Sequence, residues 1–165
     1  MKTVYIAMLA VAALPAAKAQ DCSTWTNWDL RGTYAQSGSG FIDLSRAFPG
    51  AGLPAGTVPM FWVGAFTFDG YGGGAGWVMM NTAGNLLNIQ LVDVTYSMKP
   101  DCSVRWIFSM KAKELGITVG PHHRWMVVAP QPGGPLELQQ ILSGTPPGMK
   151  AAPGFDIGVA RRISM

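Results

Sequence analysis

The charged side chains most able to do chemistry lie inside segments whose composition is typical of β-strands. They are Asp93, Arg105 and Glu137. A charge that faces outward is an ordinary surface group, whereas a carboxylate in an apolar interior needs a partner and has a shifted pKa. Asp93 shares its predicted face with Leu87, Ile89 and Leu91, while Arg105 shares its face with two serines. If they face inward, Asp93 and Glu137 are therefore the candidate catalytic residues for proton transfer or polarisation.

His122 and His123 are the only histidines of the chain. Adjacent side chains on an extended strand point to opposite faces, so the two imidazoles are not expected to bind one metal ion. The favoured interpretation is a turn with solvated imidazoles, and the alternative is a single histidine that acts as a general base. The glycine-rich segment 70–76 lacks the Gly-Lys-Ser/Thr sequence of a phosphate loop, and no Gly-x-Ser-x-Gly occurs. We expect neither a metal nor a cofactor.

Aromatic side chains give the strongest indication of a binding site. Most of them fall on predicted strands, where they either pack a core or line a pocket for an apolar or ring-containing molecule. Ten methionines, two of them in the first eight residues, would suit an adaptable lining. The candidate ligand-binding residues are Tyr34, Trp62, Phe66, Phe68, Trp106 and Phe108.

Short strands separated by turns must position these side chains. Segments 60–68, 76–81 and 86–96 form a meander, because Asp69-Gly70 and Gly84-Asn85 are typical of hairpin turns. Further strands are predicted over 30–37, 102–110, 117–119 with 125–129, 136–142 and 156–164. A break is expected at 37–40, a short strand or helical turn at 41–48, and loops at 49–59, 130–135 and 144–154. Segment 111–116 fits either a helical turn or a continued strand.

About eight strands without a long helix predict an all-β domain. Several strands are apolar on both faces, which a single open sheet could not hide from water. We therefore favour an antiparallel up-and-down barrel, with a β-sandwich as the alternative. An eight-stranded barrel has an interior just wide enough for packed side chains or one small ligand.

The first 19 residues are typical of a signal peptide, with Lys2, an apolar run to Pro15 and an Ala-x-Ala site before Gln20. The apolar run is too short to span a membrane. We predict an exported single domain over 20–165, in the periplasm or outside the cell. In an oxidising compartment, Cys22 and Cys102 would form a disulfide. Removing Lys2 and Lys18 with the signal lowers the formal net charge from +3 to +1, so we expect no nucleic-acid partner.

Three short motifs resemble a pattern found in small exported microbial proteins. They are Arg31-Gly32-Thr33-Tyr34, Phe66-Thr67-Phe68-Asp69-Gly70 and Thr95-Tyr96-Ser97-Met98-Lys99-Pro100-Asp101-Cys102. Met98 stands where the pattern usually has valine. Such proteins look like calycin-type or allene-oxide-cyclase-type β-barrels. The resemblance implies a ligand in the barrel lumen or, in some relatives, cyclisation of a small apolar molecule.

The leading hypothesis is a secreted barrel that holds a small hydrophobic or aromatic molecule in its lumen. The second is a cofactor-free cyclase or isomerase on the same barrel, and the third is a fully packed structural or surface-interaction protein. The sequence leaves the oligomeric state open. An inward Asp93 or Glu137 in an open lumen would favour the enzyme, and an uncharged open lumen would favour the carrier.

Overall fold

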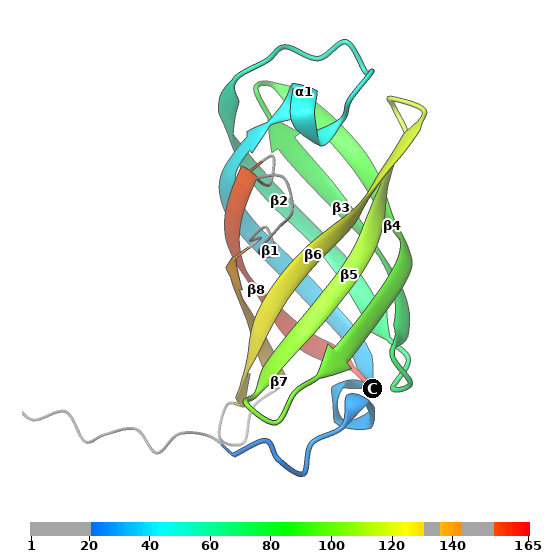
Figure 1. Ribbon diagram of the computed structural model, residues 1–165, viewed down its shortest axis with the longest axis vertical. Helices are drawn as coiled ribbons and strands as arrows, with labels where there is room; N and C mark the ends of the chain where they lie inside the picture. The colour runs from blue at the N-terminus through cyan, green and yellow to red at the C-terminus, as the bar shows by residue number, and fades with distance from the viewer. Residues whose placement is uncertain (1–20, 131–135, 143–153) are drawn as a thin grey trace, which may run out of the picture.

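The computed structural model describes residues 21–130, 136–142 and 154–165. The predicted signal peptide and most of the loops predicted over 130–135 and 144–154 lie outside these residues. Eight antiparallel strands form one closed barrel in chain order, as Figure 1 shows. The strands are β1 (Gly32–Asp43), β2 (Thr57–Phe68), β3 (Gly73–Thr82), β4 (Asn85–Met98), β5 (Ser103–Ala112), β6 (Ile117–Pro130), β7 (Leu136–Leu142) and β8 (Gly154–Ser164).

Closure of the sheet is set by the pairing of the first strand with the last. β1 pairs with β2 along its whole length, with Gly32 opposite Phe68 at one end and Asp43 opposite Thr57 at the other. The other edge of β1 pairs with β8. The predicted up-and-down barrel is confirmed, and the sandwich alternative is not realised. The predicted meander is also confirmed as β2, β3 and β4, with its turns at the two glycine-containing segments.

The break predicted at residues 37–40 is wrong, because β1 continues through it. Gly38 lies where the indole of Trp62 packs inside the barrel, and a Cβ there would sit 2.3 Å from Trp62 Cζ2. Gly158, opposite Gly38 on β8, is in contact with the same ring. These glycines therefore mark a close approach inside a strand rather than a turn.

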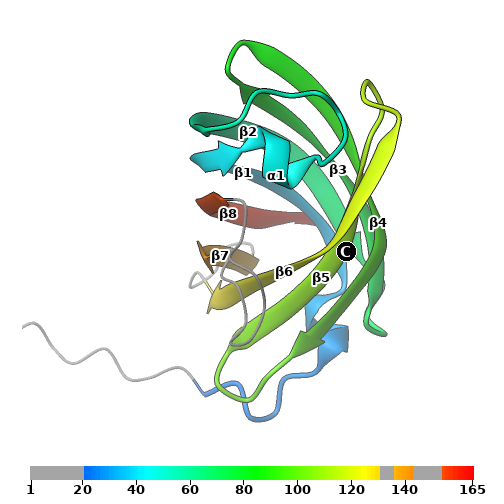
Figure 2. The same ribbon diagram turned by 45° about the horizontal axis from the view of Figure 1, so that its top comes forward.

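The segment after β1 forms a single helical turn, α1 (Leu44–Ala47), with Asp43 as its N-cap. Asp43 accepts a hydrogen bond from the backbone N–H of Arg46, which satisfies one of the free N–H groups at the start of the helix. Leu44 and Phe48 are buried against the core. Figure 2 shows α1 at one end of the barrel, so this segment covers part of that end.

The opposite end of the barrel is closed by the N-terminal segment. A short 3-10 helix, η1 (Asn27–Leu30), lies there, and the predicted disulfide between Cys22 and Cys102 ties the segment to the β4–β5 turn. The Tyr34 hydroxyl donates to the backbone oxygen of Leu30 at 2.8 Å. The backbone N–H of Met98 donates to Asn27 Oδ1 at 2.9 Å. The chain therefore seals this end with a covalent bond and several hydrogen bonds.

Closure does not bury both faces of the apolar strands. Met60, Trp62, Phe66 and Phe68 face inward, but the intervening residues of β2 remain on the outside. The large exposed apolar side chains on this side of the barrel are Phe41, Phe61, Val63, Trp77 and Leu86. Within the described ranges, no helix is both long enough and apolar enough to cross a membrane.

Candidate functional site

A layer of stacked aromatic rings fills the half of the barrel next to η1. The ring centroids of Phe68 and Tyr96 lie 3.9 Å apart, and those of Phe66 and Trp106 lie 4.7 Å apart. Tyr34 stacks on Phe66 with a centroid distance of 5.1 Å. All five side chains are at most 5% exposed. This layer, which we call the aromatic floor, separates the rest of the interior from the sealed end.

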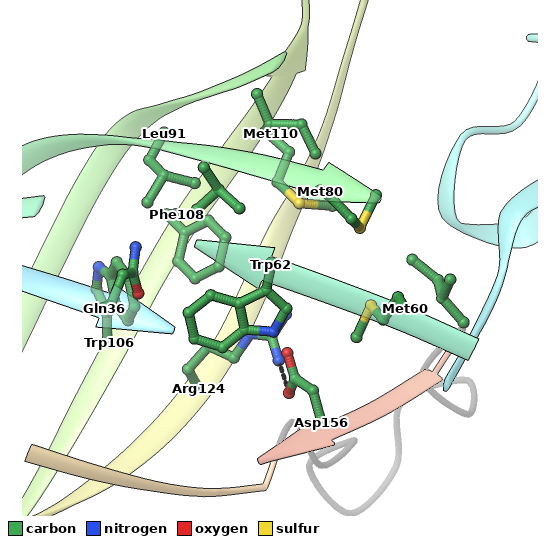
Figure 3. Close-up of a pocket in the computed structure, with 13 residues that line it drawn as sticks. Gln36, Met60, Trp62, Met80, Leu91, Trp106, Phe108, Met110, Arg124 and Asp156 are labelled. Carbon is green, nitrogen blue, oxygen red and sulfur yellow. Dashed lines mark hydrogen bonds and ion pairs between the residues drawn. The ribbon is translucent and has the colours of Figure 1, made fainter. Parts of the chain in front are cut away.

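Above the aromatic floor lies a cavity of about 60 Å³. Figure 3 shows side chains from several strands converging on it. Its apolar wall consists of Ile42, Met60, Val78, Met80, Ile89, Leu91, Phe108 and Met110, and its polar lining consists of Gln36, Trp62, Trp106, Arg124 and Asp156. A single buried water needs about 10–15 Å³ of such space, so the cavity has room for several waters or one very small molecule.

An ion pair between Arg124 and Asp156 forms one side of this cavity (Figure 3). The side chains of Arg124 and Asp156 are only 14% and 2% exposed. The Arg124 guanidinium also lies 5.8 Å from the centre of the Phe108 ring, which is a cation–π contact. Two charges taken out of water in this way depend on each other, because either one alone would carry a large desolvation cost.

The ion pair lies where the seventh strand ends. The last β6–β7 pair joins Trp125 to Leu142, and the last β7–β8 pair joins Gln140 to Gly158. Arg124 precedes Trp125 by one residue, and Asp156 precedes Gly158 by two. The side-chain bridge therefore connects β6 directly to β8 next to the last described backbone pairs of β7.

Several buried polar groups near the cavity have no hydrogen-bond partner in the described part of the chain. They are Gln36 Nε2, Trp62 Nε1, Trp106 Nε1 and His122 Nε2. An unsatisfied buried donor costs on the order of 1–3 kcal/mol. Three of these four atoms belong to residues that line the cavity. The cavity lining therefore contains several polar atoms that could form hydrogen bonds with a bound molecule or with water.

His122 lies inside the barrel on β6, with its ring 5.7 Å from that of Phe108. The prediction of a turn at the two histidines is wrong, because β6 runs through both of them. The expectation that they face opposite sides holds, since His123 lies on the outside within 3.2 Å of Arg105 Nη2. Burial lowers the pKa of His122 to about 4, and repulsion from Arg124 acts in the same direction.

We expect the neutral state of His122 to make stability depend on pH. In the unfolded chain a histidine titrates near its ordinary pKa of 6.5, whereas in the folded protein this pKa is about 4. Between these values the unfolded chain binds a proton that the folded chain does not, so stability falls as the pH is lowered through this window. The loss should be on the order of 2 kcal/mol, measurable by urea denaturation at pH 7 and pH 4.5.

The adjacent histidine provides the control for this prediction. His122→Gln should flatten the pH dependence between pH 6.5 and pH 4, whereas His123→Gln on the outer face should leave it as in the wild type. Equal slopes in the wild type and His122→Gln would show that the imidazole of His122 is not the group responsible.

Asp93 lies on the outside of the barrel, so the expectation that it shares an inner face with Leu91 is wrong. The pairing of β4 with β5 shifts between Val92 and Thr95, and Asp93 there has a φ of +53°. This β-bulge adds one residue and changes which side chains face inward, so Val94 and Tyr96 are buried instead. A catalytic role for Asp93 stays a prediction, without the buried environment from which it was derived.

Glu137 also faces away from the lumen. Its neighbours Leu136 and Leu138 on β7 point into the core, and Glu137 is paired with Arg161 across the β7–β8 ladder. Glu137 Oε2 accepts a hydrogen bond from Arg161 Nε at 2.9 Å. Hydrogen bonds from Gln139 and Arg161 hold the pKa of Glu137 below its ordinary value, so this carboxylate is a stabilised anion outside the cavity.

The six predicted ligand-binding aromatics all face inward, but not all of them reach the cavity. Trp62, Trp106 and Phe108 line it, and Trp106 also belongs to the aromatic floor. Tyr34, Phe66 and Phe68 belong to the aromatic floor, where each contacts other rings. Their role in binding a molecule stays a prediction.

The charged pair in the lumen was not found from the sequence. Alternation along β6 contains the signal, because Arg124 lies on the same face as the buried Met126 and Val128. Asp156 similarly shares a face with Gly158 and Ala160. Neither was singled out, since both lie at the edge of a predicted strand, next to a loop.

Among residues 21–130, 136–142 and 154–165, no three side chains of the metal-ligating types come together. Comparison with known protein families, with curated proteins and with solved structures finds no match to the chain. By its fold and its site, the protein is a closed eight-stranded antiparallel barrel with an aromatic core and a small, partly polar cavity.

Proposed function

We propose that the protein binds a small, mainly apolar molecule in the barrel lumen and acts as an exported carrier or sequestering protein. The observation that carries this proposal is the cavity itself, which combines an apolar wall with unsatisfied donors and a buried ion pair. A lumen that served packing alone would gain nothing from these polar groups, because each of them costs free energy when buried. The resemblance to calycin-type barrels and the disulfide agree with this proposal.

The cavity is small compared with ordinary ligand sites, which measure about 300–1,000 Å³. Three of the residues around it are Met60, Met80 and Met110. Methionine side chains are flexible and fill irregular spaces, so their rotation can enlarge the site. The bound molecule is therefore small, or it displaces methionines when it enters.

The cyclase alternative has lost its main support. It depended on a carboxylate of Asp93 or Glu137 in the lumen; Asp93 is exposed on the outside, and Glu137 points away from the lumen toward Arg161. Among the described residues that line the cavity, the carboxylate is that of Asp156, and it is paired with Arg124.

A direct test is binding of ethylbenzene, a one-ring apolar probe, measured by ligand-observed NMR and by calorimetry. Val78→Phe replaces a small aliphatic side chain of the cavity wall by a phenyl ring, which should fill the cavity and abolish binding. Val63→Phe makes the same substitution on the outside of the neighbouring strand β2 and should bind as the wild type does. Native mass spectrometry of protein from its own culture medium should also show a small co-purifying molecule. Absence of both signals in the wild type would leave a packed barrel.

A further inference from the structure

Resting on the proposed function, we propose that the bound molecule is uncharged and carries a carbonyl-type oxygen, such as that of a ketone, aldehyde, ester or amide. This oxygen accepts hydrogen bonds from donors in the cavity wall. The inference depends on which polar groups surround the cavity and on how their charges balance.

Two buried indole donors belong to residues that line the cavity. Trp62 from β2 and Trp106 from β5 line the cavity, are 7% and 2% exposed, and each has an indole Nε1 without a hydrogen-bond partner among the described residues. An indole nitrogen can only donate. The amide of Gln36, which is 7% exposed, adds a third such donor. The two tryptophans make the argument independent of how the Gln36 amide is oriented.

The two indole N–H groups would be satisfied by an acceptor atom on a molecule bound in the cavity. A hydrocarbon would leave both donors without partners and would keep the cost of burying them. A molecule with an oxygen acceptor would recover that cost on binding, so the cavity should discriminate in its favour. Figure 3 shows Gln36, Trp62 and Trp106 around the same cavity.

The charges in the cavity lining balance each other. The two charged side chains that line the cavity are Arg124 and Asp156, and they are paired with each other. An anionic ligand would compete with Asp156 for the guanidinium. A cationic ligand would compete with Arg124 in the same way. The cavity therefore favours a neutral acceptor over a carboxylate.

Three probes of similar size test the inference: acetophenone, ethylbenzene and benzoate. Acetophenone should bind about tenfold more tightly than ethylbenzene, because it adds hydrogen bonds to donors that otherwise lack partners. Benzoate should bind more weakly than acetophenone. The chain has six tryptophans, so their indole N–H signals can be followed by ¹⁵N–¹H NMR. Acetophenone should add a downfield shift from hydrogen bonding to the signals of Trp62 and Trp106, whereas ethylbenzene should cause only the ring-current shift that both probes share.

Substitution of single tryptophans supplies the matched controls. Trp62→Phe removes one donor and keeps a ring, so the preference for acetophenone over ethylbenzene should fall to about threefold. Trp106→Phe should act similarly, which keeps the test informative if one variant fails to fold. Trp77→Phe changes an exposed indole on the outside of β3 and should leave the preference unchanged.

The possible failures are distinguishable. If neither acetophenone nor ethylbenzene binds, the proposed function fails. If both bind equally and acetophenone adds no downfield shift to the indole signals, a lumen site exists but ordered water satisfies the donors, which overturns this inference alone. If benzoate binds most tightly, the cavity is an anion site and the charge argument is wrong.

Discussion

Replacing Asp156 by Asn should lower the free energy of unfolding by about 3 kcal/mol or more, because it leaves the Arg124 guanidinium buried without its counter-ion. The magnitude follows from other buried pairs, in which removal of one partner typically costs about 3–5 kcal/mol. The two side chains are 14% and 2% exposed, so water can compensate little. Urea denaturation at pH 7 measures the change.

The double variant Arg124→Met/Asp156→Leu should recover much of this loss, since it removes both charges and fills the space with apolar atoms. The pair of Arg161 and Glu137 serves as a comparison in which one partner is open to water. Arg161 is 67% exposed, whereas Glu137 is only 8% exposed but also accepts a hydrogen bond from Gln139, so Arg161→Met should cost less than Asp156→Asn. A loss below 1 kcal/mol for Asp156→Asn would mean that Arg124 reaches solvent and that the pair does not join β6 to β8.

Removal of the disulfide should have an effect of similar size. The bond between Cys22 and Cys102 closes a loop of 80 residues, and the chain-entropy model gives on the order of 4 kcal/mol for such a loop. We expect Cys22→Ser/Cys102→Ser to lose about this much stability in urea denaturation. The loss should be accompanied by earlier exchange of backbone amides near η1, where the disulfide ties the chain to the β4–β5 turn.

Reduction of the wild-type protein provides the control for the disulfide, because it breaks the same bond without changing the sequence. The reduced protein and the double serine variant should have nearly equal stabilities. A loss below 1 kcal/mol in both would show that the hydrogen bonds of Asn27 and Tyr34 hold the sealed end without the covalent bond.

The barrel could be predicted from the sequence because its strands obey local rules. The turn at Asp69 is an example, since Asp69 Oδ1 accepts hydrogen bonds from the N–H groups of Tyr71, Gly72 and Gly73 at 2.7 to 3.0 Å. An aspartate followed by glycines supplies both the acceptor and the backbone freedom for this turn. Such information lies within a few neighbouring residues, and the disulfide prediction needed only two cysteines and a compartment.

The orientation of Asp93 could not be predicted by counting residues, because a bulge changes the count. Alternation along β4 places Asp93 with Leu91, and one extra residue between Val92 and Thr95 reverses that assignment. The position of the bulge depends on pairing with β5, which lies farther along the chain. Strand periodicity therefore predicts a face reliably only as far as the next irregularity.

The ion pair in the lumen could not be predicted from the sequence for a different reason. Arg124 and Asp156 are 32 residues apart, and their meeting depends on where β7 ends between their two strands. Within its own segment of the sequence, neither residue belongs to a motif that would indicate burial or a charged partner. Only the closed register of β6, β7 and β8 brings the two side chains to the same place.

The sealed end has a consequence for how the lumen exchanges its contents. Among the described residues, the aromatic floor and η1 lie between the cavity and that end, and Tyr34, Phe66 and Phe68 there are at most 1% exposed. A cavity of about 60 Å³ has no room for two such molecules, so a resident molecule must depart before another can occupy its place. We therefore expect the rate of replacement to be set by the residence time of the departing molecule, whatever the concentration of its competitor.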